Sequence, residues 1–230
     1  MKTILLAAGF GTRLRPLTDT IPKCLVPIKG KPLLQIWLER LTESGFDKFL
    51  INTHYLSNQV NDFVYSSKFK NKCILKNEIK LLGTAGTLLT NLDFIGEDEC
   101  MLVHADNYCL ANFSDFIRAH NQRPSSCLMT MMTFRTNMPS TCGIVELDHN
   151  NVIIGFHEKV KSPPGNLANG AIYILSIDFI KLIKEKFYSV TDFSIDILPH
   201  FLGKIYSYET NDCFMDIGTP VAYNKANNLP

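Results

Sequence analysis

Apolar runs and amphipathic segments alternate through the first 120 residues. Mostly apolar runs of strand length occur at residues 3–8, 48–53, 72–75 and 100–105. Apolar residues recur at helical spacing in residues 33–45, 57–66, 84–92 and 113–120. Strands that are apolar throughout and alternate with helices are typical of βαβ units. This part of the chain therefore predicts an α/β fold in which helices cover a mostly parallel sheet.

The rest of the chain is richer in strand patterns. Short runs of β-forming residues predict strands at 127–134, 143–147, 152–157, 171–175 and 205–209. Helical spacing returns at residues 177–187 and 219–228, and Pro220 suits the first turn of the last helix. With no linker or repeat in the pattern, we expect one continuous unit with a mixed sheet.

Composition and charge exclude several classes of protein. The 230 residues are 46% hydrophobic and 20% charged, as in ordinary globular chains, and the net charge of +1 offers no broad basic field for nucleic acid. Seven scattered cysteines without a C-x-x-C pair predict reduced thiols. The apolar N-terminal run is short and no later run could span a bilayer, so we expect a cytoplasmic protein without a membrane partner.

A glycine loop follows the first predicted strand. Residues 9–14 read Gly-Phe-Gly-Thr-Arg-Leu, and a Pro-Lys pair follows at Pro22-Lys23. Glycines let backbone N–H groups approach an anion, and Arg13 and Lys23 add positive charge. The loop lacks the third glycine of a dinucleotide fingerprint and does not match a Walker A loop. We interpret it as a loop that binds the phosphates of a nucleoside triphosphate.

A second glycine-containing segment opens the helix predicted at 84–92. Residues 82–86 read Leu-Gly-Thr-Ala-Gly, with Glu78 shortly before them. The N–H and C=O groups exposed at a helix start could read the edge of a base. An ordinary helix start is the alternative interpretation.

Two aspartates follow predicted strands, and Asp106 is a candidate metal ligand. Asp106 comes directly after the apolar run 100–105, and Asp216 lies in a Phe-Met-Asp-Ile-Gly-Thr-Pro segment. In α/β sheets, ligands bind beyond the carboxyl ends of the strands. Mg²⁺ is bound in proteins by one or two carboxylates together with phosphate oxygens and water. A turn or helix cap is the alternative for each aspartate.

These segments together resemble the sugar-1-phosphate nucleotidyltransferase family, whose members make nucleoside diphosphate sugars. The resemblance rests on G-x-G-T-R-L-x-P at residues 9–16, P-K-x-L-x-P at 22–27, Lys31-Pro32, and Asp-Ile-Gly-Thr-Pro at 216–220. It covers nearly the whole chain, and the L-G-T-A-G form is similar to mannose-1-phosphate guanylyltransferases. It implies a single three-layer α/β/α Rossmann-like domain over residues 1–230, with a nucleotide-binding half at 1–110 and a β-rich sugar-phosphate-binding half at 111–230.

The resemblance also implies roles for individual residues. Arg13 and Lys23 would be the catalytic cations, and Asp106 and Asp216 would hold Mg²⁺. The residues implied to bind the nucleotide are Leu6, Ala7, Ala8, Gly9, Gly11, Thr12, Arg13, Lys23, Glu78, Gly83, Thr84 and Ala85. Those implied to bind the sugar phosphate are Asn107, Gly143, Glu158, Lys159 and Asn169.

The sequence departs from the family pattern in places. The proline that follows the family's Glu-Lys pair is absent here, since Val160 follows Lys159, and a solvated salt bridge is the alternative for that pair. Phe214 stands where family members often have tryptophan, which alters packing and leaves the chemistry unchanged. Asp196 resembles a family acidic position, and its role stays open.

The implied reaction is Mg²⁺-dependent transfer of a nucleoside monophosphate from a nucleoside triphosphate to a sugar 1-phosphate. The first choice is GTP with a mannose-like or heptose 1-phosphate, in bacterial-type surface glycan synthesis. The alternatives are a cytidylyltransferase acting on a non-sugar phosphate such as phosphocholine, and a non-catalytic nucleotide-binding regulatory subunit. The base, the sugar and the oligomeric state, including a homo-oligomer, stay open. Because the chain ends soon after Asp216, we do not expect the acyltransferase β-helix of longer members.

Overall fold

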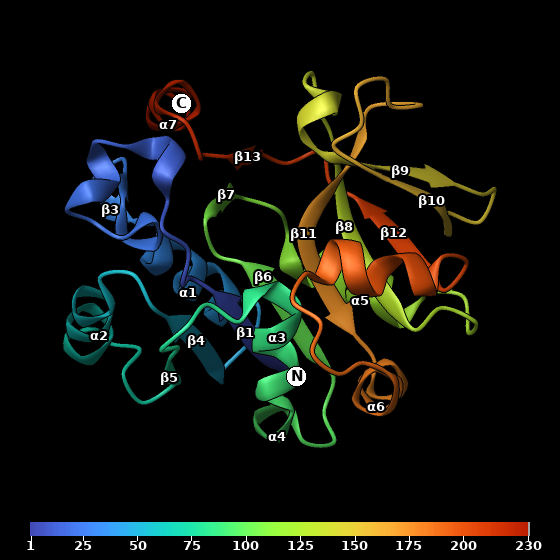
Figure 1. The fold of residues 1–230 in the computed structure, drawn as a ribbon, viewed down its shortest axis with the longest axis horizontal. Coiled ribbons are helices and arrows are strands. Elements are labelled where there is room, and N and C mark those ends of the chain that lie inside the picture. The colour runs from blue at the N-terminus through green and yellow to red at the C-terminus, as the bar shows by residue number, and fades with distance from the viewer. Residues whose placement is uncertain (230) are drawn as a thin grey trace. The chain divides into compact units, whose positions relative to one another are not determined.

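The computed structural model describes residues 1–229, which divide into two compact units (Figure 1). Unit 1 comprises residues 1–81, 103–111 and 212 onward, and unit 2 comprises residues 82–102 and 112–211. The division into a nucleotide-binding and a sugar-phosphate-binding half stays a prediction.

Unit 1 is built on three parallel strands. They are β1 (Lys2–Leu6), β4 (Phe49–Thr53) and β5 (Cys73–Asn77). β4 lies between the other two, pairs with both in parallel, and is buried along its whole length. Such a strand needs apolar residues on both faces, which explains why Phe49, Leu50 and Ile51 follow one another in the sequence.

Two helices of unit 1 connect these strands. α1 (Leu33–Glu43) buries leucines and Trp37 at helical spacing, and α2 (Ser57–Ser66) buries Val60 and Val64. The apolar stripe of an amphipathic helix packs against the core and leaves its polar face in water. The parallel strands and their connecting helices form the βαβ arrangement that the sequence predicts.

The shorter elements of unit 1 bring the end of the chain beside its middle. β13 (Phe214–Asp216) pairs antiparallel with β7 (Asn107–Cys109), and Asp216 stands opposite Asn107. α7 (Pro220–Asn227) follows, and the Thr219 side chain caps it by accepting from the Ala222 N–H. A further pair, β2 (Pro27–Ile28) and β3 (Lys31–Pro32), precedes α1.

Unit 2 is mostly antiparallel. Its strands are β8 (Met129–Arg135), β9 (Gly143–Leu147), β10 (Ile153–Glu158), β11 (Leu167–Leu175) and β12 (Ile205–Glu209). All their pairs are antiparallel except β8 with β12. Its helices are α3 (Gly83–Thr90), α4 (Leu92–Ile95), α5 (Phe113–Asn121) and α6 (Ile177–Lys186). β6 (Cys100–His104) begins in unit 2 and ends in unit 1.

The predicted fold class is confirmed, because the chain has helices and both parallel and antiparallel strand pairs. The structure differs from the predicted elements at β11, which begins at Leu167 and not at residue 171. Its pairing with β8 is irregular between Asn169 and Tyr173, where Ala171 has a positive φ of 52°. An irregularity of this kind interrupts the alternation by which strands are recognised in a sequence.

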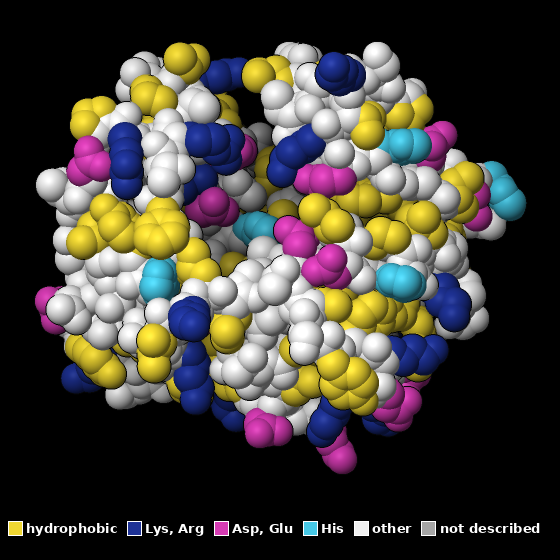
Figure 2. All heavy atoms as spheres, in the orientation of Figure 1, with side chains coloured by type: hydrophobic (Ala, Val, Ile, Leu, Met, Phe, Trp, Pro, Cys, Tyr) yellow, Lys and Arg dark blue, Asp and Glu magenta, His cyan; other side chains and the backbone are white. Residues whose placement is uncertain are grey.

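The surface matches the composition. On the face shown in Figure 2, lysine and arginine side chains are interspersed with aspartate and glutamate side chains. Within residues 1–229, no disulfide links any of the seven cysteines. In the same residues, every helix is too short or too polar to cross a membrane.

Candidate active site

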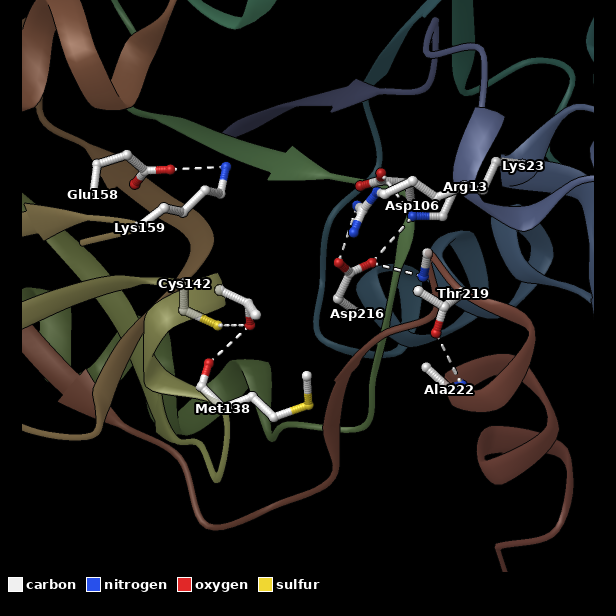
Figure 3. Close-up of polar contacts among 12 residues, drawn as sticks. Arg13, Lys23, Asp106, Met138, Cys142, Glu158, Lys159, Asp216, Thr219 and Ala222 are labelled. Atoms are coloured by element: carbon white, nitrogen blue, oxygen red, sulfur yellow. Dashed lines mark hydrogen bonds and ion pairs between the residues drawn. The ribbon is translucent and has the colours of Figure 1, made fainter. Parts of the chain in front are cut away.

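Lys23 is the centre of a cluster of four charged side chains in unit 1. Its Nζ lies 2.9 Å from Asp106 Oδ2 and 3.2 Å from Asp216 Oδ1. Figure 3 shows its amino group directed at both carboxylates. Lys23 opens a short 3-10 helix, between buried Pro22 and buried Cys24, and its own side chain is only 6% exposed. A lysine this deeply buried needs anionic partners, and the two predicted metal ligands supply them.

Arg13 completes the cluster from the more exposed side. It lies in the 3-10 helix Thr12–Leu14 that follows the glycine loop, and its Nη2 is 3.2 Å from Asp216 Oδ2. The loop depends on Gly11, which has a φ of +63°. A Cβ on Gly11 would lie 3.0 Å from Thr18 Cγ2 and 3.1 Å from Lys23 Cβ. The Gly-x-Gly spacing therefore lets the loop turn tightly beside Lys23.

Gly218 leaves room for the same cluster, and sequence reasoning missed it as a site residue. A Cβ on Gly218 would lie 2.7 Å from Arg13 Nη2 and 2.8 Å from Asp216 Oδ1. The Gly218 N–H also donates to Asp216 Oδ1 at 2.8 Å. The Ile-Gly-Thr segment after Asp216 was the sequence signal that could have identified Gly218, because a glycine beside a candidate metal ligand often lets another group approach the backbone closely.

The four side chains balance one another electrically, with two carboxylates and two cations. Burial by itself would raise the pKa of Asp106, but the charge and hydrogen bond of Lys23 at 2.9 Å, together with the charge of His104 and a backbone hydrogen bond, lower the pKa below its ordinary value. Asp106 is therefore ionised at neutral pH and available as an oxygen ligand.

Asp106 and Asp216 fit a magnesium site completed by a substrate. Both carboxylates reach the same lysine nitrogen, so their oxygens converge on one small region. Within residues 1–229, no group of three or more His, Cys, Asp or Glu side chains is arranged to hold a metal. Two carboxylates suit Mg²⁺, which keeps several waters and takes further oxygens from phosphates.

A chain of buried amide hydrogen bonds supports the start of the glycine loop. The Ala7 N–H donates to Asn52 Oδ1 at 2.7 Å, and Asn52 Nδ2 donates to Glu78 Oε1 at 2.9 Å. Asn52 lies on β4 and was missed from the sequence, although one polar residue near the end of an apolar strand was a usable signal. The contacts orient Glu78, which is predicted to bind the nucleotide. Of the other nucleotide-binding candidates in this loop, Leu6 and Ala8 are buried, whereas Gly9 is exposed.

In unit 2, the predicted base-reading segment forms the first turn of α3. Gly83 has a φ of +76°, and the Ala85 N–H donates to Thr191 O at 2.9 Å. Thr84 Oγ1 accepts from the Phe193 N–H at 2.7 Å. The Ala85 N–H is thus already used within the protein. Any base contact through a backbone N–H of this turn would fall to Gly83 or Thr84.

The predicted sugar-phosphate residues of unit 2 lie on or directly after strands of its sheet. Glu158 ends β10, stands opposite Gly143 of β9, and pairs with Lys159 Nζ at 2.9 Å (Figure 3). A Cβ on Gly143 would lie 2.5 Å from Glu158 Oε2, so this glycine makes room for the carboxylate. Lys159 has a φ of 49°, and its N–H donates to Cys142 O at 3.1 Å.

The two predicted asparagines are held by their neighbours. Asn169 Nδ2 donates to the Tyr173 hydroxyl at 2.7 Å, and its Oδ1 accepts from the Ala171 N–H at 2.8 Å. In unit 1, the Asn107 carbonyl accepts from Trp37 Nε1 at 2.9 Å. Two hydrogen bonds thus hold the Asn169 side chain, which suits a residue that orients a ligand, whereas the bond at Asn107 holds its backbone.

Comparison with known proteins identifies the family to which the chain belongs. A family model described as nucleotidyl transferase matches residues 2–229. The chain belongs to the nucleotidyl transferase family. Its resemblance to that family, predicted from the glycine loop and the Asp-Ile-Gly-Thr-Pro segment, is thereby confirmed.

Relatives within the nucleotidyl transferase family have several named activities. The chain is 30% identical over 229 residues to the mannose-1-phosphate guanyltransferase of Saccharomyces cerevisiae, covering 96% of this chain and 62% of the yeast protein. It is 32% identical over 182 residues to a glucose-1-phosphate thymidylyltransferase of Streptomyces griseus, covering 76% of this chain and 49% of that protein. The chain spans about 62% of the length of the first curated relatives it matches.

Solved structures agree with the fold. The crystal structure of HddC from Yersinia pseudotuberculosis complexed with GMP-PN superposes with a TM-score of 0.82 at 27% identity. The match covers 98% of this chain and 97% of that one. The fold of that protein therefore extends over nearly the whole chain.

Proposed function

We propose that this protein is a sugar-1-phosphate nucleotidyltransferase, which transfers a nucleoside monophosphate from a nucleoside triphosphate to a sugar 1-phosphate. The observation that carries the proposal is the cluster in which buried Lys23 contacts both Asp106 and Asp216 while Arg13 contacts Asp216. Arg13 directly follows the glycine loop and Lys23 lies beside Gly11, so both cations are close to the backbone N–H groups that would bind the phosphates of a triphosphate. Family membership and the named activities of the relatives support the same reaction class.

The reaction needs no nucleophile from the protein. An oxygen of the sugar 1-phosphate is already an anion and attacks the α-phosphorus of the triphosphate. A new P–O bond forms there, the bond to the β-phosphate oxygen breaks, and pyrophosphate leaves with the electron pair. The protein has to align two polyanions and offset their repulsion.

The two cations of the cluster take separate roles. Lys23, whose position is fixed by burial, stabilises the negative charge at the α-phosphate. Arg13, which is more exposed and lies at the end of the glycine loop, stabilises the charge that develops on pyrophosphate. Both cations pair with carboxylates in the structure described here and would exchange those partners for phosphate oxygens.

Asp106 and Asp216 would hold Mg²⁺, which when bound neutralises phosphate charge and helps to orient the substrates. Their own contribution is to present ionised oxygens at one place. Asp106 does so from a half-exposed position beside Lys23, whose charge favours the ionised carboxylate.

Guanine and a mannose-like or heptose 1-phosphate are the first choice of substrates. The guanyltransferase activity of the yeast relative and the GMP-PN in the HddC complex support guanine. Other relatives are named thymidylyl-, adenylyl- and uridylyltransferases, so the test has to compare all four nucleoside triphosphates. Glu158, Lys159 and Asn169 would bind the sugar phosphate, with Lys159 supplying the charge for its phosphate group.

The test is pyrophosphate release with Mg²⁺, the four common nucleoside triphosphates, and a panel of sugar 1-phosphates together with phosphocholine. We expect release with GTP and a mannose-like or heptose 1-phosphate, and none after Asp106→Ala. The matched control is Asp115→Ala, which removes a surface carboxylate paired with Arg118. Release with phosphocholine alone would indicate a cytidylyltransferase, and no release with any pair would indicate a regulatory subunit.

A further inference from the structure

In unit 2, residues 191–197 form a turn that includes the short π-helix Phe193–Ile197, and side-chain oxygens bond most of its backbone N–H groups. Asp196 Oδ2 accepts from the N–H groups of Thr191 at 2.9 Å and Asp192 at 2.8 Å. Asp192 Oδ1 accepts from the N–H groups of Ser194 and Ile195, at 2.8 and 2.9 Å. The Asp196 N–H donates back to Asp192 O at 2.8 Å. Two carboxylates thus hold the turn closed on itself.

The one remaining N–H group within residues 191–196 is bonded outside the turn. It belongs to Phe193 and donates to Thr84 Oγ1 at 2.7 Å. In the opposite sense, the Thr191 carbonyl accepts from the Ala85 N–H at 2.9 Å. A Cβ on Gly83 would lie only 2.3 Å from that carbonyl oxygen. The turn therefore lies directly against the first residues of α3 and bonds two of them.

The turn is anchored in the core of unit 2. The Phe193 ring is fully buried, with its centroid 4.8 Å from that of Tyr173 and 6.1 Å from that of Phe179. The Ser194 side chain hydrogen-bonds the Tyr173 hydroxyl, which also accepts from Asn169. Close-packed aromatic cores move little, so the turn can hold Thr84 and Ala85 in fixed positions.

We propose that Asp196 is a positioning residue for the nucleotide. It closes the turn 191–197, the turn holds Thr84 and Ala85, and the first turn of α3 is thereby pre-shaped for the base of the triphosphate. The inference rests on the proposed function, because it takes residues 83–85 as part of the nucleotide site. Asp196 itself touches no substrate, and its effect is transmitted through Thr191 and Phe193.

The alternative to positioning is a purely structural role, in which Asp196 contributes only to stability. The two differ in where the effect of a substitution appears. A pre-shaped binding turn lowers the entropy that is lost on binding, so loosening it weakens nucleotide binding and leaves the chemical step intact. A structural role lowers the unfolding temperature and leaves the KM for each substrate unchanged.

The experiment compares Asp196→Ala, Asp196→Asn and the control Asp178→Ala, an exposed carboxylate in the first turn of α6. Steady-state kinetics give KM and kcat for GTP and the sugar 1-phosphate. We expect Asp196→Ala to raise the KM for GTP about tenfold, with kcat within about twofold of wild type. Asp196→Asn keeps an acceptor oxygen and should restore part of the loss, and Asp178→Ala should match wild type.

Amide hydrogen exchange supplies a readout that does not need turnover. The Ala85 N–H should exchange faster in Asp196→Ala than in wild type, while exchange in residues 177–186 stays unchanged. An unchanged KM for GTP together with unchanged exchange at Ala85 would overturn the proposal. So would equal losses in kcat and in affinity for both substrates. If the wild-type protein releases no pyrophosphate with any substrate pair, the proposed function fails, and exchange at Ala85 with calorimetric GTP binding still decides the role of Asp196.

Discussion

Lys23 Nζ lies 2.9 Å from Asp106 Oδ2, although 83 residues separate the two along the chain. The same nitrogen reaches Asp216, which is 193 residues away. A short 3-10 helix, the turn between β6 and β7, and the end of β13 each supply one of these groups within unit 1. This convergence turns three separate motifs into one candidate site. Two of the four predictions below concern this cluster, and two concern residues of unit 2.

Arg13 and Arg15 provide a matched pair of exposed arginines two residues apart. Arg13 contacts Asp216 of the cluster, whereas Arg15 pairs with Asp19 at 3.0 Å. We expect Arg13→Ala to lower kcat/KM by about a hundredfold or more, because a preorganised charge at the leaving group is lost. Arg15→Ala should stay within about twofold of wild type. Pyrophosphate release measures both, and equal activity of the two variants would contradict the role of Arg13.

Gly218→Ala should disturb the cluster without removing a charge. The added Cβ would lie 2.7 Å from Arg13 Nη2 and 2.8 Å from Asp216 Oδ1, so both side chains must shift. We expect turnover to fall by about tenfold or more, since a displacement of roughly 1 Å can cost a hundredfold. Gly165→Ala is the control, because nothing lies within 4 Å of its Cβ position. Thermal unfolding should show both variants folded, and full activity of Gly218→Ala would refute the argument.

Gly143→Ala should act on the sugar phosphate. Its Cβ would lie 2.5 Å from Glu158 Oε2 and 2.6 Å from a ring carbon of Phe156, which forces the carboxylate away from its position. We expect the KM for the sugar 1-phosphate to rise about tenfold or more while the KM for the triphosphate changes little. Initial rates with each substrate varied in turn make the distinction. A rise confined to the triphosphate KM would count against Glu158 as a sugar ligand.

The buried His120 should make stability depend on pH. Burial lowers the pKa of His120, whose ring lies 2.8 Å from Thr130 Oγ1 and 3.1 Å from Glu99 Oε1, with the charge of Arg123 acting in the same direction as burial. The hydrogen bond from His120 in turn lowers the pKa of Glu99. The unfolded chain therefore binds protons more readily than the folded one at both sites. The stability that these groups contribute is present above their ordinary pKa values and is lost on acidification.

Urea unfolding at several pH values tests the predicted loss of stability on acidification. From about pH 6.5 downward, the free energy of unfolding should fall by up to about 1.4 kcal/mol per pH unit through His120 alone. His120→Gln should flatten that part of the profile, whereas His149→Gln, at an exposed turn, should leave it as in wild type. Identical slopes for wild type and His120→Gln between pH 6.5 and 5 would contradict the assignment.

Local pattern was enough to predict most elements and the family. The helix predicted at 57–66 has those bounds in α2, and the apolar runs at 48–53 and 100–105 became β4 and β6. These predictions succeed because the spacing of apolar residues along the chain indicates which face of a helix or strand is buried. The glycine loop and the Asp-Ile-Gly-Thr-Pro segment are local in the same sense, so they identified the family without coordinates.

Only the tertiary structure showed which distant groups meet. That Lys23 holds both aspartates, that Asn52 links Ala7 to Glu78, and that the turn closed by Asp196 holds Thr84 depend on how strands and loops pack. Residue spacing encodes which face of an element is buried, whereas the partner of a polar side chain is chosen by the three-dimensional path of the whole chain. The role of Asp196 was therefore open in the sequence, and its hydrogen bonds to Thr191 and Asp192 supply the physical basis for assigning one.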